Sequence, residues 1–343
     1  KVILSAPYDN FTKYFNKNKY DYIPYTYKRK SFNIFENLKI IFFYLKVILK
    51  QKPDIMLLYT IKPNILISIS SIISNRKIKI YNFITGLGSF YFANNFKKKL
   101  IFFLYKIAFI KSEKIIFQNI DDLNVFISNK IISKNKALLI PGSGVDTSFF
   151  KFNQIKNKKS SHLNFLCISR IIFQKGIIEY LEAAKMIKKE FPNISFSLVG
   201  SIDLDNISSL NLNKILSYKK YVKYSKFTSN IYELLNECDC FVLPSYREGT
   251  SKSILEAASV GIPIITTNVP GCNNIVQDNQ NGYLCKPRDI ISLYECLKKM
   301  INTTFQKRNE MSIKSRKIIE KSFDIEIINN QILHELNLNK NVN

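Results

Sequence analysis

The sequence predicts an α/β fold built from two doubly wound, Rossmann-like parallel-sheet domains that face each other across a cleft. Short apolar runs alternate with segments of helical periodicity from end to end, which is typical of βαβ units. The 343 residues also exceed the size at which one core usually stops growing, about 250–300 residues. Finally, a polar, lysine-rich stretch, KFNQIKNKKSSH, divides two series of predicted strands.

The domain limits follow from that stretch. We expect a first domain at residues 1–148, a linker at 149–163, a second domain at 164–322 and a C-terminal helix within 323–343 that packs back on the first domain. The chain begins at Lys1, directly in the strand-like KVILS, which indicates a fragment trimmed at its front.

The individual elements are predicted from apolar periodicity and from the turn residues between them. In the first half, strands are expected at 2–5, 55–60, 78–84, 114–118 and 137–140, and helices at 35–50, 63–74, 96–111 and 120–129. In the second half, strands are expected at 164–169, 194–199, 221–224, 240–243 and 262–267.

Composition excludes some classes of protein and leaves others open. A hydrophobic fraction of 46% with 22% charged residues is ordinary for a globular chain and argues against disorder. The net charge of +25, from 51 basic and 26 acidic residues, favours phosphorylated ligands, nucleic acid or an anionic membrane. The lysines accompany abundant Ile, Asn, Tyr and Phe, so a compositional bias of the genome explains the charge equally well.

The cysteines and histidines argue against a zinc site and against catalysis by a histidine-activated nucleophile. The six cysteines include no CxxC pair and no histidine cluster for zinc, which predicts free and mostly buried thiols in a reducing compartment. Only His162 and His334 are present, so a Ser-His-Asp or Cys-His mechanism has almost no residues to use. No run reaches the ~18–20 apolar residues that a membrane span needs.

The stretch YREGTSKSILEAASVGIPIITT sets two glutamates eight positions apart, after a buried strand. Glu248 falls in the loop at the carboxyl end of that strand. Thr250 or Ser251 can begin a helix that ends at Gly261, and this places Glu256 more than one turn into the helix. The two carboxylates therefore serve different parts of one ligand. Free N–H groups from Gly249 onward offer an anion site between them.

A second anion site is predicted in SRIIFQKG. Arg170 and Lys175 follow the strand NFLCIS and precede a helix that opens at Gly176. Two cations in one loop at the carboxyl end of a strand can hold a diphosphate, with arginine as a bidentate fork and lysine as a point charge. Taken alone, the same loop is also compatible with ordinary solvated lysine and arginine side chains.

Together these motifs resemble the retaining glycosyltransferases of group 1, also called family 4, which have the GT-B fold. The resemblance covers nearly the whole chain. It rests on SRIIFQKG, LVG, CDCFVLPSYREGTSKSILEAASVGIPIITTNVPGCNNIV and NGYLCKPRD. In the first half, LYTIKPNI, FITGLGSF and IPGSGVDTSFF are similar to the subgroup that extends polyprenyl-diphosphate-linked saccharides.

The resemblance implies a role for each matching position. Glu248 would contact hydroxyls of the donor sugar and stabilise the developing oxocarbenium ion, and Glu256 would hold the ribose hydroxyls of the nucleotide. Arg170 and Lys175 would neutralise the leaving diphosphate as catalytic residues. Further donor-binding groups would be the backbone amides of Gly249, Thr250 and Ser251, and the backbone at Gly86 and Gly88, where glycine permits close approach.

The resemblance also implies the reaction and its partners. The expected reaction moves a hexose or N-acetylhexosamine from a UDP-sugar to a polyprenyl-diphosphate-linked saccharide, in cell-surface polysaccharide or glycan biosynthesis. No cofactor and no metal are expected, because positioned cations and amides can stabilise the leaving group. The Asp203-Leu-Asp205 motif is interpreted as an exposed turn.

Two departures from the family pattern leave an alternative open. Many members carry a histidine near the position of Thr85, and this sequence does not. Family members also normally begin with a strand, a glycine-bearing loop and a helix before the element at KVILSAP. If that unit is missing, this fragment can be inactive. The alternative function is a non-catalytic homologue that binds lipid-linked sugar or acts as a scaffold.

A lipid-linked acceptor implies a peripheral location on the cytoplasmic face of the inner membrane. The segment FKKKLIFFLYKIAFIKSEK interleaves lysine with large apolar residues, as an interfacial helix on anionic lipid does. A core helix with a basic exposed face fits the segment equally well. A nucleic-acid partner is not expected, because no recognised binding motif is present.

Overall fold

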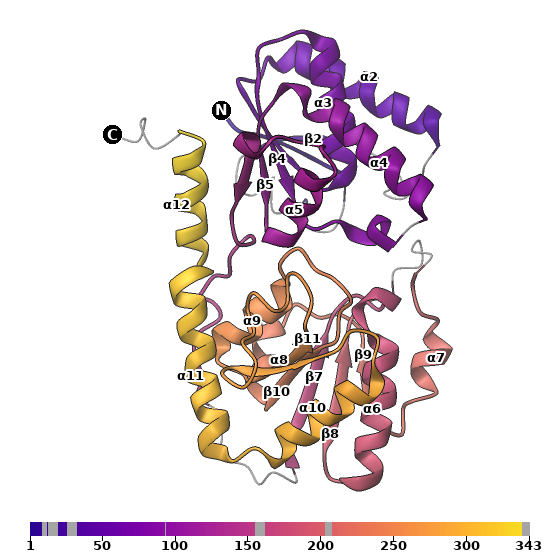
Figure 1. The fold of residues 1–343 in the computed structure, drawn as a ribbon, viewed down its shortest axis with the longest axis vertical. Helices are drawn as coiled ribbons and strands as arrows, with labels where there is room; N and C mark the ends of the chain where they lie inside the picture. Colours follow the sequence, from indigo (N-terminus) through magenta and orange to yellow (C-terminus); the bar gives the residue numbers. More distant parts are fainter. Residues whose placement is uncertain are drawn as a thin grey trace.

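The computed structural model describes residues 1–8, 12, 20–25, 33–92, 94–154, 162–202 and 208–337. The Asp203-Leu-Asp205 motif and residues 155–161 of the expected linker lie outside these residues. Two α/β domains are stacked along the long axis of the molecule, and the last two helices run beside both (Figure 1).

The first domain is built on a parallel four-stranded sheet in the order β3-β4-β5-β6. A separate parallel pair, β1-β2, precedes it in the chain. The strands are β1 (Ile3–Ala6), β2 (Asp21–Pro24), β3 (Ile55–Tyr59), β4 (Lys79–Ile84), β5 (Ser112–Phe117) and β6 (Ala137–Leu139).

Helices cover this sheet and share its apolar core. They are α2 (Ile34–Gln51), α3 (Ile61–Ser74), the 3₁₀ turn η1 (Gly88–Phe92), α4 (Asn95–Ala108), η2 (Phe109–Lys111), α5 (Ile120–Ser128) and η3 (Lys134–Lys136). Asn side chains begin three of these helices: Asn33 caps α2, Asn94 caps α4 and Asn119 caps α5, each accepting bonds from first-turn amides.

The second domain contains a parallel six-stranded sheet in the order β12-β11-β10-β7-β8-β9. Its strands are β7 (Asn164–Ile168), β8 (Ser195–Val199), β9 (Lys223–Ser225), β10 (Cys240–Leu243), β11 (Ile264–Thr267) and β12 (Gly282–Cys285). The central strand β10 is buried along its whole length, as expected for a strand covered by helices on both faces.

The helices of the second domain pack around this sheet. They are η5 (Phe173–Lys175), α6 (Ile177–Glu190), α7 (Leu212–Leu216), α8 (Ile231–Glu237), α9 (Lys252–Val260), α10 (Ile290–Asn302) and α11 (Phe305–Ser322), and a last helix, α12 (Ile325–Glu335), follows them in the chain. Gly261 ends α9 in the left-handed conformation, with φ of +91°, as the sequence predicts.

Helix α12 lies against the first domain (Figure 1). Its Ile328 and the following Leu336 share an apolar cluster with Tyr81, Phe83 and Ile116 of the first sheet. Because the chain crosses back in this way, the last two helices connect the domains at one side.

The α/β class and both parallel sheets are confirmed, and the ten expected strands are present with ends shifted by a few residues. Strands β2 and β12 were not predicted. All six cysteines are free, and four of them are buried. Within the described part of the chain, every helix is too short or too polar to span a bilayer.

Candidate functional site

The candidate site lies where the strand order of the second sheet reverses. From β7 the chain proceeds outward through β8 and β9, whereas β10, β11 and β12 lie on the other side of β7. In open α/β sheets, ligands bind at the carboxyl ends of the strands where the strand order reverses. Arg170 and Lys175 follow β7, and Glu248 follows β10. The topology therefore brings together the two loops that the sequence singled out.

These two loops are packed backbone to backbone. A Cβ atom on Gly176 would lie 1.9 Å from the carbonyl oxygen of Pro244, and the residue has φ of +69°, so glycine is needed there on both counts. The Tyr246 N–H donates to the Gln174 carbonyl at 2.8 Å, and the Ser245 hydroxyl donates to the same oxygen at 3.1 Å. The loop after β10 is thereby fixed on the loop after β7.

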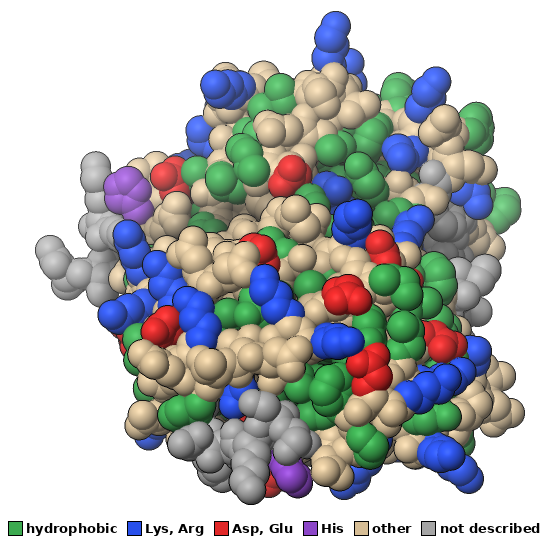
Figure 2. Space-filling view, turned by 60° about the horizontal axis from the view of Figure 1, so that its bottom comes forward, with side chains coloured by type: hydrophobic (Ala, Val, Ile, Leu, Met, Phe, Trp, Pro, Cys, Tyr) green, Lys and Arg blue, Asp and Glu red, His purple; other side chains and the backbone are tan. Residues whose placement is uncertain are grey.

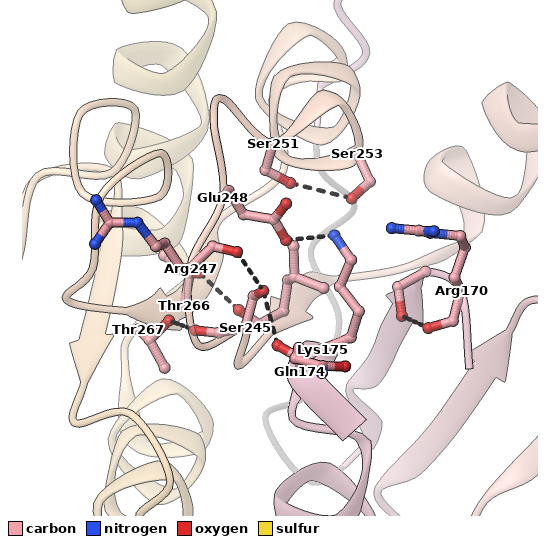
Figure 3. A network of polar contacts seen from close by, with 12 residues as sticks. Arg170, Gln174, Lys175, Ser245, Arg247, Glu248, Ser251, Ser253, Thr266 and Thr267 are labelled. Carbon is pink, nitrogen blue, oxygen red and sulfur yellow. Dashed lines mark hydrogen bonds and ion pairs between the residues drawn. The ribbon is translucent and has the colours of Figure 1, made fainter. Parts of the chain in front are cut away.

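Glu248 and Lys175 form an ion pair between these two loops (Figure 3). Their side chains are only 13% and 18% exposed, so the pair is partly desolvated and stronger than a surface pair. Arg170 extends toward the same space from beyond Lys175. Its side chain is exposed and makes no ion pair within the described residues, which leaves its five N–H donors available to a ligand.

Two buried thiols lie close to this pair. Burial raises the pKa of Cys272 to about 12, with a smaller contribution from the Glu248 carboxylate. Burial likewise raises the pKa of Cys167 to about 12. Both thiols stay protonated at neutral pH, so neither supplies a thiolate nucleophile to the site.

Glu256 lies on α9, eight residues after Glu248, with its side chain 13% exposed. Burial raises the pKa of its carboxyl to about 7, and the Lys252 ammonium, 3.9 Å away, offsets only part of this rise. A carboxyl with such a pKa is poised between its two protonation states at neutral pH. A carboxyl with such a perturbed pKa is a candidate for binding or catalysis.

The amide groups at the start of α9 differ in one respect from the sequence prediction. Ser251 begins the helix, but its N–H donates to the Gly271 carbonyl at 3.0 Å, so the expectation that this amide is free is wrong. The loop after β11 approaches closely because residue 271 is a glycine, and its carbonyl satisfies the donor. Among the described residues, no acceptor faces the amides of Gly249 and Thr250.

Gly86 and Gly88 lie in the loop after β4, and only the first makes a close backbone approach. A Cβ atom on Gly86 would lie 2.9 Å from the amide nitrogen of Gly249, whereas one on Gly88 would make ordinary contact with Ile61. A Cβ atom on Gly249 would lie 2.3 Å from the Thr85 carbonyl oxygen. The two domains therefore meet by direct backbone contact beside Glu248.

Three residues at this domain contact were missed by the sequence analysis. Arg247 pairs with the buried Asp122 of the first domain, and Asn119 donates to the Gly249 carbonyl at 2.8 Å. In the sequence, Asn119 and Asp122 indicate only the start of a helix, and nothing marks a partner about 125 positions away. The described residues contain no cluster of three or more His, Cys, Asp or Glu side chains with metal-binding geometry.

Two protein families and several curated proteins match the sequence of this chain. The family described as "Glycosyl transferases group 1" matches residues 148–318, and "Glycosyl transferase 4-like" matches residues 2–119. The chain is 31% identical over 312 residues to the N,N'-diacetylbacillosaminyl-diphospho-undecaprenol alpha-1,3-N-acetylgalactosaminyltransferase of Campylobacter jejuni, covering 86% of this chain and 80% of that protein. It is 27% identical over 310 residues to the UDP-Gal:alpha-D-GlcNAc-diphosphoundecaprenol alpha-1,3-galactosyltransferase of Escherichia coli, covering 86% and 78%.

Solved structures resemble the fold over almost its full length. Anabaena Alr3699/HepE, crystallised with UDP and glucose, superposes with a TM-score of 0.77 at 18% identity, covering 98% of this chain and 91% of that one. The sucrose-phosphate synthase of Thermosynechococcus elongatus also reaches 0.77, covering 92% and 81%. With its two parallel-sheet domains, its motifs and these relatives, the chain belongs to the group 1 glycosyltransferases of GT-B fold.

Proposed function

We propose that this enzyme is a retaining glycosyltransferase that moves a hexose or N-acetylhexosamine from a UDP-sugar to a polyprenyl-diphosphate-linked saccharide. The observation that carries the proposal is the Lys175–Glu248 pair at the carboxyl ends of β7 and β10, with Arg170 beside it and Glu256 on the following helix. Two cations after β7, one carboxylate after β10 and a second on α9 match a ligand that has a diphosphate between two sets of hydroxyls.

The cations bind the part of the donor that carries charge. Arg170 can hold diphosphate oxygens through its forked N–H groups, and Lys175 adds a point charge. The amides of Gly249 and Thr250, at the start of α9, supply further donors where the helix dipole favours an anion. As the bond between the sugar C1 and the diphosphate oxygen breaks, its electron pair moves to UDP, and these groups stabilise the charge that develops there.

The carboxylates bind the two sugars of the donor. Glu248 accepts hydrogen bonds from hydroxyls of the transferred sugar and stabilises positive charge at its C1, which the acceptor hydroxyl then attacks while its proton passes to the departing diphosphate oxygen. Glu256 accepts hydrogen bonds from the ribose. Hydroxyls donate to a carboxylate, so ribose binding favours the ionised form of Glu256 and lowers its raised pKa.

The relatives support the donor, the acceptor class and the stereochemistry. The Escherichia coli protein is named for UDP-Gal, and both it and the Campylobacter jejuni protein are named for acceptors that carry a sugar on diphospho-undecaprenol. Both are alpha-1,3-transferases. An α product made from an α-linked nucleotide sugar retains the configuration at C1. A capsular polysaccharide glycosyltransferase of Staphylococcus aureus, 27% identical over 309 residues, supports a role in cell-surface glycan synthesis.

A lipid-linked acceptor requires the enzyme to work at a membrane surface, and α4 offers a suitable face. Phe96, Leu100 and Phe103 are exposed on this helix together with Lys99 and Lys106. These positions follow helical spacing, so they share one face. The segment Asn95–Ala108 contains no acidic residue. Exposed aromatic rings beside lysines bind anionic lipid through burial of the rings and attraction of the charges.

Helix α2 repeats the same pattern. Phe35, Leu38 and Phe42 are exposed with Lys39 and Lys46, at the spacing seen on α4. Helix α3 contacts both helices and lies between them, so the two faces belong to one side of the first domain (Figure 1). By contrast, on the face shown in Figure 2, Lys and Arg are interspersed with acidic and apolar side chains. This comparison supports a peripheral location of the enzyme, with the first domain toward the cytoplasmic face of the inner membrane.

Calorimetric titration with UDP, GDP and ADP tests the proposed donor site. We expect UDP to bind most tightly. We expect Arg170→Ala to weaken it by about tenfold or more, because charge-assisted hydrogen bonds are lost. Glu248→Ala should leave most of the UDP affinity, because UDP lacks the transferred sugar, and should abolish transfer. If Arg170→Ala binds UDP as the wild type does, and Glu248→Ala still transfers sugar, the assignment of the site is wrong.

A further inference from the structure

One segment of the first domain holds the loop that carries Glu248. Residues 247–250 of the second domain each contact residues 118–122 of the first. Arg247 pairs with Asp122, Asn119 bonds the carbonyls of two loop residues, and the Thr250 hydroxyl donates to the Gln118 carbonyl at 3.2 Å. The contacts therefore begin one residue before Glu248 and continue two residues after it.

The Arg247–Asp122 pair is buried at the domain contact. Asp122 is fully buried, and the Arg247 side chain is 10% exposed. Two guanidinium nitrogens of Arg247 contact one carboxylate oxygen, with the Nε atom 3.1 Å away. The guanidinium also lies over the Tyr91 ring, 4.0 Å from its centroid. Removing one partner would leave the other charge buried and uncompensated, so the pair holds its geometry firmly.

Asn119 ties the same segment to the backbone of Glu248 itself. Its side-chain amide donates to the Gly249 carbonyl at 2.8 Å and lies 3.4 Å from the Glu248 carbonyl. The same amide is 3.2 Å from the Asp122 carboxylate, and the Asn119 oxygen caps α5 by accepting from the Asp122 amide at 2.8 Å. Asn119 and Asp122 thus form one rigid unit at the first turn of α5.

We propose that Asp122 and Asn119 are positioning residues for Glu248, so that the first domain sets the orientation of the carboxylate that meets the donor sugar. The proposal rests on the proposed function, because it takes Glu248 as the group that contacts this sugar. The first domain then acts on the chemical step through the position of Glu248.

The orientation of the side chains supports this role. The Glu248 carboxylate faces Lys175 in the second domain, whereas Arg247 points away from it toward the first domain (Figure 3). Neighbouring residues are thus anchored in opposite directions, and the backbone between them is fixed. A contact that served only to join the domains would not need to involve the carbonyls of Glu248 and Gly249.

A second contact holds the domains in the same relation. The Arg288 guanidinium of the second domain lies 5.1 Å from the ring centroid of Phe92 in η1 and 4.8 Å from that of Tyr246. Tyr246 in turn donates to the buried Glu179 at 2.6 Å. The 3₁₀ turn η1 therefore contacts both Arg247, next to Glu248, and Arg288.

Asp122→Asn tests the proposal, with Asp121→Asn as its matched control. Asp121 is exposed on the same turn of α5, so its substitution removes the same charge without touching Arg247. Turnover would be measured as UDP released from UDP-galactose or UDP-N-acetylgalactosamine with undecaprenyl-diphosphate-linked N-acetylglucosamine. UDP affinity would be measured by calorimetry. Circular dichroism would verify folding, and Arg247→Gln would provide a second variant that removes the other partner.

We expect Asp122→Asn to lower kcat by about tenfold or more while the dissociation constant of UDP stays within about threefold of wild type, because Arg170 and Lys175 hold the diphosphate from the other loop whereas Glu248 lies in the displaced one. Asp121→Asn should match wild type in both. The Asp122→Asn/Arg247→Gln double variant should lose no more than the worse single variant, as partners in one interaction do. Wild-type kcat in Asp122→Asn, or a parallel loss of kcat and UDP affinity, would overturn the proposal.

Two further measurements separate this proposal from the proposed function. Glu248→Gln tests the proposed function alone, because full turnover in that variant would remove Glu248 from the reaction whatever Asp122 does. Hydrogen exchange of backbone amides tests whether Asp122 positions the Glu248 loop, and it does so without an activity measurement. The Glu248 and Ser251 amides donate to the carbonyls of Pro270 and Gly271, and both should exchange faster in Asp122→Asn than in Asp121→Asn. Equal exchange in the two variants would contradict a positioning role.

Discussion

The raised pKa of Glu256 leads to a prediction about proton linkage. If this carboxylate holds the ribose, UDP should bind more weakly to the protonated form, and binding should release protons near pH 7. Glu256→Gln is the informative change, because it keeps the shape of the side chain and removes its titration. Burial raises the pKa of Glu256 from 4.5 to about 7.

The size of the effect follows from that pKa. About one tenth of Glu256 is ionised at pH 6 and about nine tenths at pH 8. If UDP binds only the ionised form, its affinity should therefore be about tenfold weaker at pH 6 than at pH 8. The folded state also binds this proton more tightly than the unfolded chain. The contribution of Glu256 to the free energy of unfolding is therefore largest below about pH 4.5. It is lost as the pH rises through 7, by up to about 3 kcal/mol.

Calorimetry at pH 6, 7 and 8, in buffers with different ionisation enthalpies, measures both affinity and proton release. The terminal phosphate of UDP titrates near pH ~6 as well, but it does so equally in the wild type and in Glu256→Gln. The ratio of their affinities therefore isolates Glu256. Urea unfolding at pH 8 gives an independent measure, and the variant should be more stable than wild type there because it carries no desolvated charge.

Glu310→Gln is a suitable control, because Glu310 is an exposed glutamate on α11. It should follow the wild type in UDP affinity and in proton release at every pH. If Glu256→Gln shows the same pH dependence and the same proton release as wild type, Glu256 does not hold the ribose.

Three further predictions concern other parts of the molecule. Gly176→Ala should lower the free energy of unfolding by about 3 kcal/mol or more, measured in urea, because its Cβ would lie 1.9 Å from the Pro244 carbonyl oxygen. Iodoacetamide at pH 8 should not alkylate Cys272 or reduce turnover, since burial raises the pKa of this thiol to about 12; modification of Cys272 in the folded enzyme, seen by mass spectrometry, would contradict this. Phe103→Ser should weaken sedimentation with vesicles of anionic phospholipid, whereas Phe227→Ser, an exposed phenylalanine in the second domain, should not; equal losses would argue against α4 as the membrane face.

Periodicity predicts the elements of this fold that alternate regularly, and it fails at the short strands. Strand β12 has only four residues and follows Asn281 within NGYLC, a stretch with too few alternations to separate a strand from a loop. Strand β2 is formed by DYIP, where a terminal proline argues against an interior strand. Both are stabilised by pairing with β11 and β1, which local sequence does not reveal.

The site is partly predictable for a related reason. Arg170, Lys175 and Glu248 follow predicted strands, so the topology alone gathers them at one edge of the sheet. The bond from the Ser251 amide to Gly271 and the pair between Arg247 and Asp122 depend on how distant loops and whole domains pack. Such contacts leave no local periodicity, and only the tertiary structure reveals them.

The measurement that tests the central claim most directly is transfer from UDP-galactose and UDP-N-acetylgalactosamine to undecaprenyl-diphosphate-linked N-acetylglucosamine, with the anomeric configuration of the product determined by NMR. The wild type should give an α-linked product from at least one donor, and Glu248→Gln should give none although it still binds UDP. A β-linked product, or undiminished transfer by Glu248→Gln, would contradict a retaining mechanism centred on the Lys175–Glu248 pair.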